Sequence, residues 1–362
     1  MAKNLINERF LRQLWIAPEL AIEKLNLIYA SDDELKIKRK KKSKHFIYEY
    51  KGGLLNNEEE LKRIKNLVIP PAWENVLISY LPNTHLQATG RDEKKRKQYR
   101  YHPVWNKVRN QTKFYRMLFF GDVLPLIREQ IDLDLNQKGW PKTKTLALVL
   151  KLMEETHIRV GNEQYAKRNK TYGLSTLRTK HINITKDKLK FQFTGKKGKK
   201  HKVTVRNKKL RFLVNKCLEI PGWELFKYYD KKGEKHTVDS SMINNYIFKL
   251  SKEHFTAKDF RTWAASVIFF NTLYDLGIVE EEKQQDKNIL TAYDVTAKAL
   301  GNTRNVCRKY YVHPIIPKSY KDQSIMSAFK IIDDLESTSP NFSETERALM
   351  HLLENFKPDL KF

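Results

Sequence analysis

The chain contains 362 residues, and 40% of them are hydrophobic, so two or three domains with buried cores can form. Lys and Arg outnumber Asp and Glu by 69 to 42, which gives a formal net charge of +27 at pH 7. An excess of this size favours a polyanionic partner, because each neutralised phosphate releases condensed counterions. The two cysteines, Cys217 and Cys307, form no CxxC pair, which argues against a disulfide scaffold or a structural zinc site.

Nothing in the sequence predicts contact with a membrane. The apolar stretch around residues 14–22 is interrupted by Pro18 and Glu19, so it does not have the pattern of a signal peptide. No apolar run approaches the ~18 residues that a membrane-spanning helix needs. We therefore expect a cytoplasmic protein in a reducing compartment.

The first third of the chain is predicted to hold a helical extension and a β-rich domain. Residues 1–28 have the spacing of one or two amphipathic helices, which Pro18 divides. Residues 29–107 contain short alternating segments that predict strands of a DNA-binding domain. Seven Lys or Arg lie in the nine positions from 36 to 44, so this segment is either a solvated tail or a phosphate-binding segment.

Residues 108–362 are predicted to form a larger, mainly helical catalytic domain, which makes the fold class α+β. Apolar residues between positions 146 and 153 fall on one helical stripe. One β-hairpin interrupts the helices, because residues 189–205 alternate between apolar and polar on both sides of a glycine-containing turn. The tip of this hairpin carries Lys196 among other lysines.

Four residues far apart in the sequence would form one active site if the fold brought them together. Arg159 and Arg261 could each present a guanidinium to non-bridging phosphate oxygens. Lys196 could protonate a leaving oxygen, and Tyr311 could attack phosphorus. Each also has an ordinary alternative: helix capping for Arg159, a solvated turn for Lys196, an ion pair with Asp259 or Asp275 for Arg261, and packing or stacking for Tyr311.

The segments around these residues form an ordered set of motifs. They read IRVGN at 158–162, FTGK at 193–196, KDFRT at 258–262, and LGNT followed by CRKYYVHP within 300–314. Upstream lie IPPAW at 69–73, QATGRD at 87–92 and RKQYRYHP at 96–103. Together they resemble the poxvirus-like type IB DNA topoisomerases, and most closely their bacterial branch. The resemblance runs from about residue 29 to residue 314 and does not cover residues 1–28 or the tail beyond 320.

This resemblance implies a role for each candidate. Tyr311 would be the nucleophile that forms a 3′-phosphotyrosyl bond, and Lys196 would be the general acid. Arg159 and Arg261 would hold the scissile phosphate. The two domains would clamp duplex DNA, and the residues expected to face it are Arg96, Gln98, Tyr99 and Tyr101 in the small domain and Tyr165 in the large one.

Asn302 departs from the poxviral pattern, in which this position carries a catalytic histidine. Asn can donate a hydrogen bond to a phosphate oxygen, but it cannot carry a proton or a charge near pH 7. We therefore expect Asn302 to keep the contact with weaker electrostatic stabilisation. Because fixed cations stabilise the reacting phosphate, the implied reaction needs neither ATP nor a metal ion. The expected enzyme is a nucleoid-associated monomer that relaxes supercoils by single-strand cleavage, strand rotation and religation.

Two other functions remain open on the sequence. A tyrosine recombinase or integrase uses a similar set of residues, but recombinases commonly place a histidine three residues before the second arginine, and this chain has Lys258 there. A non-enzymatic DNA-packaging protein would explain the net charge of +27 but not the ordered motifs. An assay of supercoil relaxation would separate the three.

Overall fold

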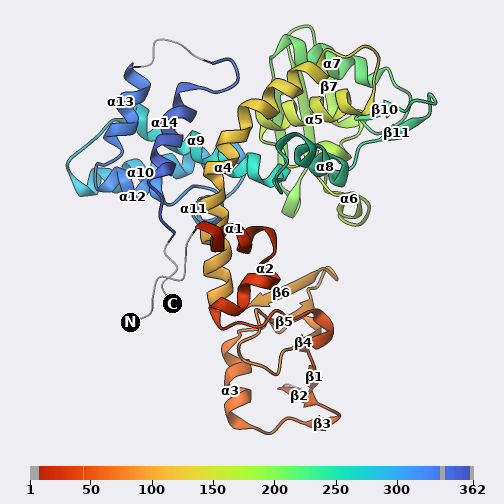
Figure 1. The fold of residues 1–362 in the computed structure, drawn as a ribbon. Coiled ribbons are helices and arrows are strands. Elements are labelled where there is room, and N and C mark those ends of the chain that lie inside the picture. Colours follow the sequence, from red (N-terminus) through yellow and green to blue (C-terminus); the bar gives the residue numbers. More distant parts are fainter. Residues whose placement is uncertain (1–7, 44, 335–338, 359–362) are drawn as a thin grey trace. The chain divides into compact units, whose positions relative to one another are not determined.

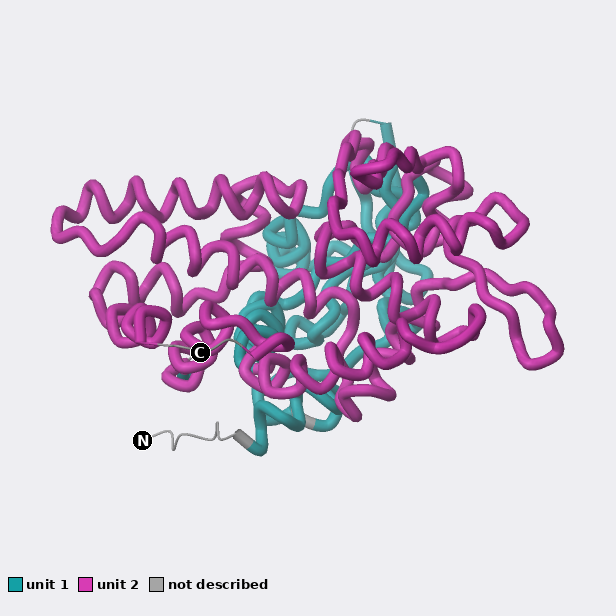
Figure 2. The backbone as a smooth tube through the Cα atoms, turned by 90° about the horizontal axis from the view of Figure 1, so that it is seen from above, with its two compact units in different colours: residues 1–115, 357–362 teal, residues 116–356 magenta. Residues whose placement is uncertain are grey.

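The computed structural model describes residues 8–43, 45–334 and 339–358 of the chain (Figure 1). The chain divides into two compact units, residues 1–115 with 357–362 and residues 116–356 (Figure 2). Helix α4, Pro103–Leu135, begins in the first unit and continues into the second. The first unit contains the larger sheet and the second unit is mainly helical, which confirms the predicted α+β class.

A six-stranded antiparallel sheet with the order β3-β2-β1-β4-β5-β6 forms the first unit. Its strands are β1 (Ile37–Lys42), β2 (His45–Tyr50), β3 (Gly53–Leu54), β4 (Glu74–Ile78), β5 (Leu86–Arg91) and β6 (Lys97–Tyr101). The helical segments of this unit are α1 (Glu8–Ile16), α2 (Pro18–Ala21), η1 (Ile22–Leu25), η2 (Asp32–Glu34) and α3 (Glu58–Asn66). Ile64 of α3 belongs to the same buried cluster as Ile37, Val76, Ile78 and Ala88 of the sheet, so α3 covers one sheet face.

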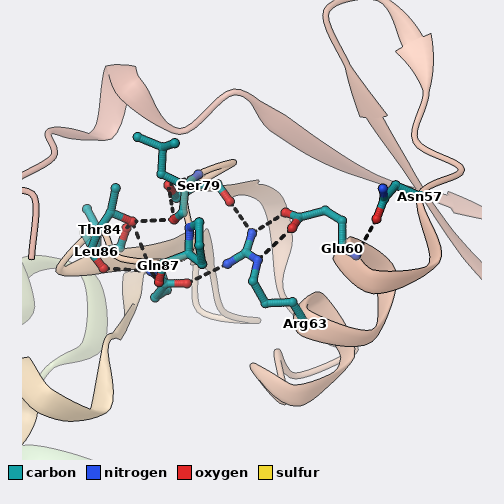
Figure 3. Close-up of polar contacts among 9 residues, drawn as sticks. Asn57, Glu60, Arg63, Ser79, Thr84, Leu86 and Gln87 are labelled. Atoms are coloured by element: carbon teal, nitrogen blue, oxygen red, sulfur yellow. Dashed lines mark hydrogen bonds and ion pairs between the residues drawn. The ribbon is translucent and has the colours of Figure 1, made fainter.

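Arg63 fixes α3 to the sheet through polar contacts (Figure 3). Its Nη1 donates to Gln87 Oε1 at 2.6 Å, and its Nε donates to Glu60 Oε2 at 2.9 Å. Gln87 is buried on β5, and its amide donates to the Thr84 carbonyl at 2.7 Å. Gln87 therefore satisfies its buried amide within this unit, as buried polar groups generally do.

The lysine-rich segment of the first unit is a strand and not a solvated tail. Residues 37–42 form β1, which pairs with β2 on one side and β4 on the other. Ile37 is buried, while Lys38 and Lys40 are exposed. Arg39 donates to the Trp73 carbonyl at 2.7 Å. The solvated-tail alternative is therefore wrong for this segment, because alternation of the side chains lets one face join the core. Residue 44 lies outside the described residues.

The second unit is mainly helical and contains two small antiparallel sheets. Its helices are α5 (Lys142–Thr156), α6 (Glu163–Asn169), α7 (Lys208–Leu218), α8 (Ser240–Ser251), α9 (Ala257–Leu276), α10 (Glu282–Leu300), α11 (Arg304–Tyr310), α12 (Ile315–Lys321), α13 (Met326–Asp334) and α14 (Glu344–Glu354). Its 3₁₀ turns are η3 (Leu174–Thr176), η4 (Thr179–His181) and η5 (Lys196–Gly198). One sheet has the order β7-β8-β9, with β7 (Ile182–Ile184), β8 (Leu189–Thr194) and β9 (Lys200–Val205). The other pairs β10 (Lys227–Tyr229) with β11 (Lys235–Thr237).

Helix α9 lies at the centre of the second unit and contacts α5, α8, α10, α12 and α14. A buried ion-pair network joins this core. Trp263 of α9 donates its indole N–H to Glu346 of α14 at 2.7 Å, and Arg128 of α4 donates to the same carboxylate at 2.8 Å. Arg128 also pairs with Glu154 of α5 at 2.8 Å. These contacts hold the helix that carries Arg261 in a fixed position.

Candidate active site

Arg261 is a buried residue on the first turns of α9. Only 4% of its surface is exposed. Its Nη1 donates to the His157 carbonyl, and its Nη2 donates to the Leu300 carbonyl at 3.0 Å. Asp259, offered by the sequence as a surface partner, instead caps α9 through the Thr256 N–H at 2.8 Å and accepts from Arg116 at 2.9 Å. The surface-pair alternative for Arg261 is therefore wrong.

Burial changes the acidity of the Arg261 guanidinium. It lowers the pKa of Arg261 to about 10, helped by the nearby positive charge of Arg159. The guanidinium nevertheless stays charged at pH 7. Its Nε is buried and makes no well-formed hydrogen bond among the described residues, and the guanidinium interacts with the Tyr311 hydroxyl. An anion beside Arg261 would satisfy this donor and offset the repulsion between the two arginines.

His157 and Gly161 shape the segment that carries Arg159. Helix α5 ends at Thr156, and His157 adopts the left-handed conformation with φ 53° and ψ 19°. A glycine commonly ends a helix, so Gly161 is the expected stop after α5, but His157, four residues before it, caps the helix. Gly161, at φ +103°, instead lets two backbone segments approach each other closely, because the backbone of Gly173 packs directly against it. A methyl group added to Gly173 would lie 2.4 Å from the Arg159 carbonyl oxygen.

Arg159 reaches Asn302, which follows the end of α10. Its Nη2 donates to Asn302 Oδ1. Helix α10 ends with Gly301 in the left-handed conformation at φ 61°, and the Asn302 N–H then donates back to the Ala297 carbonyl at 2.9 Å. Asn302 Nδ2 is also buried and makes no well-formed hydrogen bond in the described part of the chain, and the Asn302 side chain interacts with the Cys307 thiol. Arg159 is therefore not a helix cap, since its guanidinium turns to a residue 143 positions away.

Tyr311 follows α11 and is held by its backbone. Its N–H donates to the Cys307 carbonyl at 3.0 Å. The hydroxyl of Ser266, one turn beyond Arg261 on α9, lies 3.3 Å from the Tyr311 carbonyl oxygen and accepts from the His313 N–H at 3.0 Å. Sequence reasoning missed Ser266, because a serine inside a helix gives no local signal of a contact 45 residues away.

The Tyr311 ring faces Arg261, whose guanidinium carbon lies 5.6 Å from the ring centroid. Burial acts to raise the pKa of Tyr311, but the charges of Arg261 and Arg159 outweigh it, so the pKa falls below the usual value for tyrosine. A lower pKa makes the nucleophilic phenolate more accessible near neutral pH. The neighbouring Tyr310 is exposed instead, with Lys309 over its ring.

Lys196 is influenced by the charges of Arg159 and Tyr311, but it lies on a hairpin tip and not on an α-helix. It begins η5 at the tip of the β8–β9 hairpin, where the Gly195 N–H donates to the Lys199 carbonyl at 2.7 Å. Surrounding protein atoms hinder hydration of the ammonium, and Arg159 adds repulsion, so the pKa of Lys196 is lowered, while Tyr311 acts in the opposite direction. The side chain is exposed, so the hairpin presents it to solvent near Arg159 and Tyr311.

Two family models match the chain. Residues 94–334 match the family model described as the catalytic core of eukaryotic DNA topoisomerase I. Residues 45–92 match the model of the bacterial DNA topoisomerase IB N-terminal domain. The chain belongs to the type IB DNA topoisomerase family.

Viral topoisomerases are among the relatives. The DNA topoisomerase 1B of Acanthamoeba polyphaga mimivirus is 35% identical over 287 residues, which cover 76% of this chain and 84% of that protein. The DNA topoisomerase 1B of Vaccinia virus strain Copenhagen is 24% identical over 262 residues, covering 72% of this chain and 78% of that protein. These matches confirm the predicted family and support neither the recombinase nor the packaging alternative.

The residues predicted to face DNA in this topoisomerase lie on two surfaces. In the first unit, Asp92 accepts from Arg96 Nε at 2.7 Å and from Gln98 Nε2 at 2.9 Å. Tyr99 is exposed and stacks on Tyr101, with ring centroids 5.8 Å apart. Asp92 thus orients Arg96 and Gln98, whereas Tyr99 and Tyr101 alternate with Gln98 along β6 and extend from the other face of the strand.

Tyr165 lies in the second unit on the short helix α6, and it is also exposed. The Asn162 side chain caps this helix by accepting from the Tyr165 N–H at 3.2 Å. Tyr165 is thus an exposed side chain on a capped helix only a few residues after Arg159.

One group of side chains in the described ranges could hold a metal ion. The potential cluster found there consists of Asp230, Glu234 and His236 at the β10–β11 turn. None of these three belongs to the arginine, lysine and tyrosine set. In addition, no helix of the described residues is long and apolar enough to cross a membrane.

Proposed function

We propose that the chain relaxes supercoiled duplex DNA with Tyr311 as its nucleophile. The observation that carries this assignment is the convergence of Tyr311, Arg261, Arg159 and Asn302. These residues come from four separate segments of the second unit, and Arg261 Nε and Asn302 Nδ2 are buried donors that no well-formed hydrogen bond satisfies among the described residues. Family membership supports the activity, and the geometry supports the roles.

In the proposed cleavage step, the phenolate oxygen of Tyr311 attacks the scissile phosphorus. A new P–O bond to tyrosine forms, the bond to the 5′ oxygen breaks, and Lys196 protonates that leaving oxygen. Arg159, Arg261 and Asn302 donate to the non-bridging oxygens, where negative charge increases. The 3′-phosphotyrosyl bond conserves the energy of the broken link, so the free 5′-OH can reverse the reaction after the strand has rotated.

We propose further that residues 29–107 form the DNA-binding domain and residues 108–362 the catalytic domain, after an N-terminal extension of residues 1–28. Tyr99 and Tyr101 would meet the duplex from the first, and Tyr165 from the second. The enzyme would act as a monomer on nucleoid DNA in the cytoplasm. The protein cations supply the charge stabilisation, so the proposed reaction uses neither ATP nor a metal ion.

The test is relaxation of positively and negatively supercoiled plasmids in EDTA without nucleotide. Both should be relaxed, and quenching with detergent should trap a covalent protein–DNA adduct at a 3′ phosphate. Increasing salt should weaken binding strongly, because Lys–phosphate contacts are lost. A strict requirement for magnesium or ATP would reject the mechanism. Strand exchange between two sites without relaxation would favour the recombinase alternative.

A further inference from the structure

His201 occupies an unusual place between two parts of the active site. It lies on β9 directly opposite Phe193 of β8, at the base of the hairpin tip that carries Lys196. The two rings stack with centroids 4.9 Å apart and an interplanar angle of 8°. The His201 ring is therefore held flat against the hairpin by its cross-strand neighbour.

One edge of the His201 ring lies against Gly195, the residue before Lys196. A methyl group added to Gly195 would lie 2.7 Å from both Cδ2 and Nε2 of His201. Real side chains do not approach so closely, so the ring occupies the space that any larger residue at position 195 would need. His201 and Gly195 therefore fix the direction in which the backbone enters the tip.

Another edge of the same ring lies against Gly301, the residue before Asn302. A methyl group added to Gly301 would lie 3.0 Å from His201 Cε1. Gly301 is the left-handed residue that ends α10 and directs Asn302 to Arg159. The imidazole is thus a spacer between the turn that carries Lys196 and the turn that carries Asn302.

The electrostatic surroundings keep this spacer neutral. Burial, then the charges of Arg159, Lys199 and Arg261, lower the pKa of His201. A neutral ring adds no charge to the three cations around it. A Lys or Arg side chain in the same place would repel them, whereas a flat neutral ring can fill the gap.

We propose that His201 is a positioning residue that seats the Lys196 hairpin on the Gly301–Asn302 turn and so places the general acid beside the scissile phosphate. This inference rests on the proposed function, in which Lys196 protonates the leaving oxygen. In this proposal His201 acts through Phe193, Gly195 and Gly301, its neighbours in the structure, and not on the reacting atoms. Its contribution is made through the place it gives to Lys196.

The test compares single-turnover cleavage of ordinary duplex DNA with cleavage of DNA whose scissile 5′ bridging oxygen is sulfur. A thiolate leaves without a proton, so the second substrate does not need the general acid. His201→Ala should cleave ordinary DNA about 10–100 times more slowly, because displacement of a catalytic group by about 1 Å can cost ~10²-fold. It should cleave the sulfur-containing DNA at nearly the wild-type rate. Both rates are measured in one enzyme preparation, so their ratio does not depend on the fraction that is folded.

A second pair of variants tests the contact itself. Gly195 has φ −98°, which alanine also adopts, so Gly195→Ala adds only the methyl group that meets the His201 ring. Gly195→Ala should slow ordinary cleavage as His201→Ala does. Removing the ring removes the clash, so the double variant should be no slower than His201→Ala alone. Thr204→Ala, an exposed change further along β9, is the matched control and should leave both rates unchanged.

Three results would overturn the inference. His201→Ala could cleave ordinary DNA at the wild-type rate, it could lose the same factor on both substrates, or the effects of Gly195→Ala and His201→Ala could simply multiply. Lys196→Ala measured in parallel separates this failure from that of the proposed function. If sulfur rescues Lys196→Ala but not His201→Ala, only the role of His201 is wrong; if it rescues neither, Lys196 is not the acid.

Discussion

Arg261 and Lys196 carry the same charge but are supported in opposite ways. Arg261 is buried on a long helix and anchored by the carbonyls of His157 and Leu300. Lys196 is exposed at the tip of a hairpin. This contrast fits two kinds of chemistry. Stabilising charge requires donors that are fixed before the reaction, whereas delivering a proton requires a group within hydrogen-bond reach of the leaving oxygen.

The largest effect should come from Tyr311, the proposed nucleophile, which lies beside Arg261. Tyr311→Phe removes only the phenol oxygen, so DNA binding should persist while the covalent adduct disappears. Denaturing gel electrophoresis of mixtures with end-labelled DNA measures the adduct. Tyr310→Phe is the matched control, since Tyr310 is exposed and outside the arginine cluster. Adduct formation by Tyr311→Phe and none by Tyr310→Phe would shift the nucleophile to residue 310.

The next largest effect should come from Lys196, the exposed cation of the pair. Lys196→Ala should slow cleavage of ordinary DNA by roughly 10²–10⁴, the usual contribution of general acid catalysis. Cleavage of the sulfur-containing DNA should recover most of this loss. Lys197→Ala and Lys199→Ala serve as controls from the same tip and should retain single-turnover cleavage at saturating enzyme. Equal losses for all three lysines would make the hairpin a DNA-binding arm only.

A charge-conserving substitution tests Arg261, the buried cation of the pair. Arg261→Lys keeps one positive charge, but an ammonium cannot reproduce the fork that reaches two carbonyls. Cleavage should fall by about 10²–10³, the loss typical for removing a fixed donor to a developing anion. Sulfur at the leaving position should restore little, because the defect concerns the non-bridging oxygens. Full rescue by sulfur would contradict the division of roles.

Asn302 should give a smaller effect than either cation. Asn302→Ala removes one donor, while Arg159 and Arg261 remain, so we expect about 10²-fold slower cleavage or less. Asn302→His, which restores the poxviral residue, is the informative companion and should equal or exceed the wild-type rate. If Asn302→Ala cleaves as fast as wild type in a single turnover, the residue only completes the turn after α10.

The smallest predicted effect concerns stability and not catalysis. Burial, then the charge of Arg261, lower the pKa of His157 to about 4. The unfolded chain therefore binds this proton near pH 6.5 while the folded chain does not, so stability falls as the pH drops from 7 towards 4. At pH 5 this residue should cost about 1–2 kcal/mol of unfolding free energy.

His157→Asn isolates this titration, because Asn tolerates the left-handed conformation and does not ionise. Urea unfolding of wild type and variant at pH 7 and pH 5 gives the difference. The pH-dependent loss should be smaller in the variant. An identical loss in both proteins would show that other histidines account for it.

The sequence indicated the candidates but not how they are held. Arg159, Arg261, Asn302 and Tyr311 stood out because each lies in a short motif, and the structure brings them together. Their roles remain predictions. The α+β class followed from a change of hydrophobic period, from two in the first third to that of helices later.

The sequence could not indicate which groups hold the site residues in place, because those contacts join segments that are distant in the chain. The carbonyls of His157 and Leu300 hold Arg261, yet every residue has a carbonyl, so no residue type marks them. The end of α5 was expected at Gly161, but His157 accepted the left-handed conformation where a glycine is usual. Ser266 and His201 likewise reveal their contacts only once distant segments are packed.

The anchoring of Arg261 also bears on the order in which a newly made chain gains its abilities. The Arg261 guanidinium donates to the carbonyls of His157, after α5, and Leu300, at the end of α10. The second of these acceptors does not exist until residue 300 has been synthesised. Tyr311 follows only after that. A growing chain that already contains the basic sheet of the first unit could thus bind DNA long before it could cut it. With the proposed roles, strand breakage would thus begin only when the groups that reseal the strand are present.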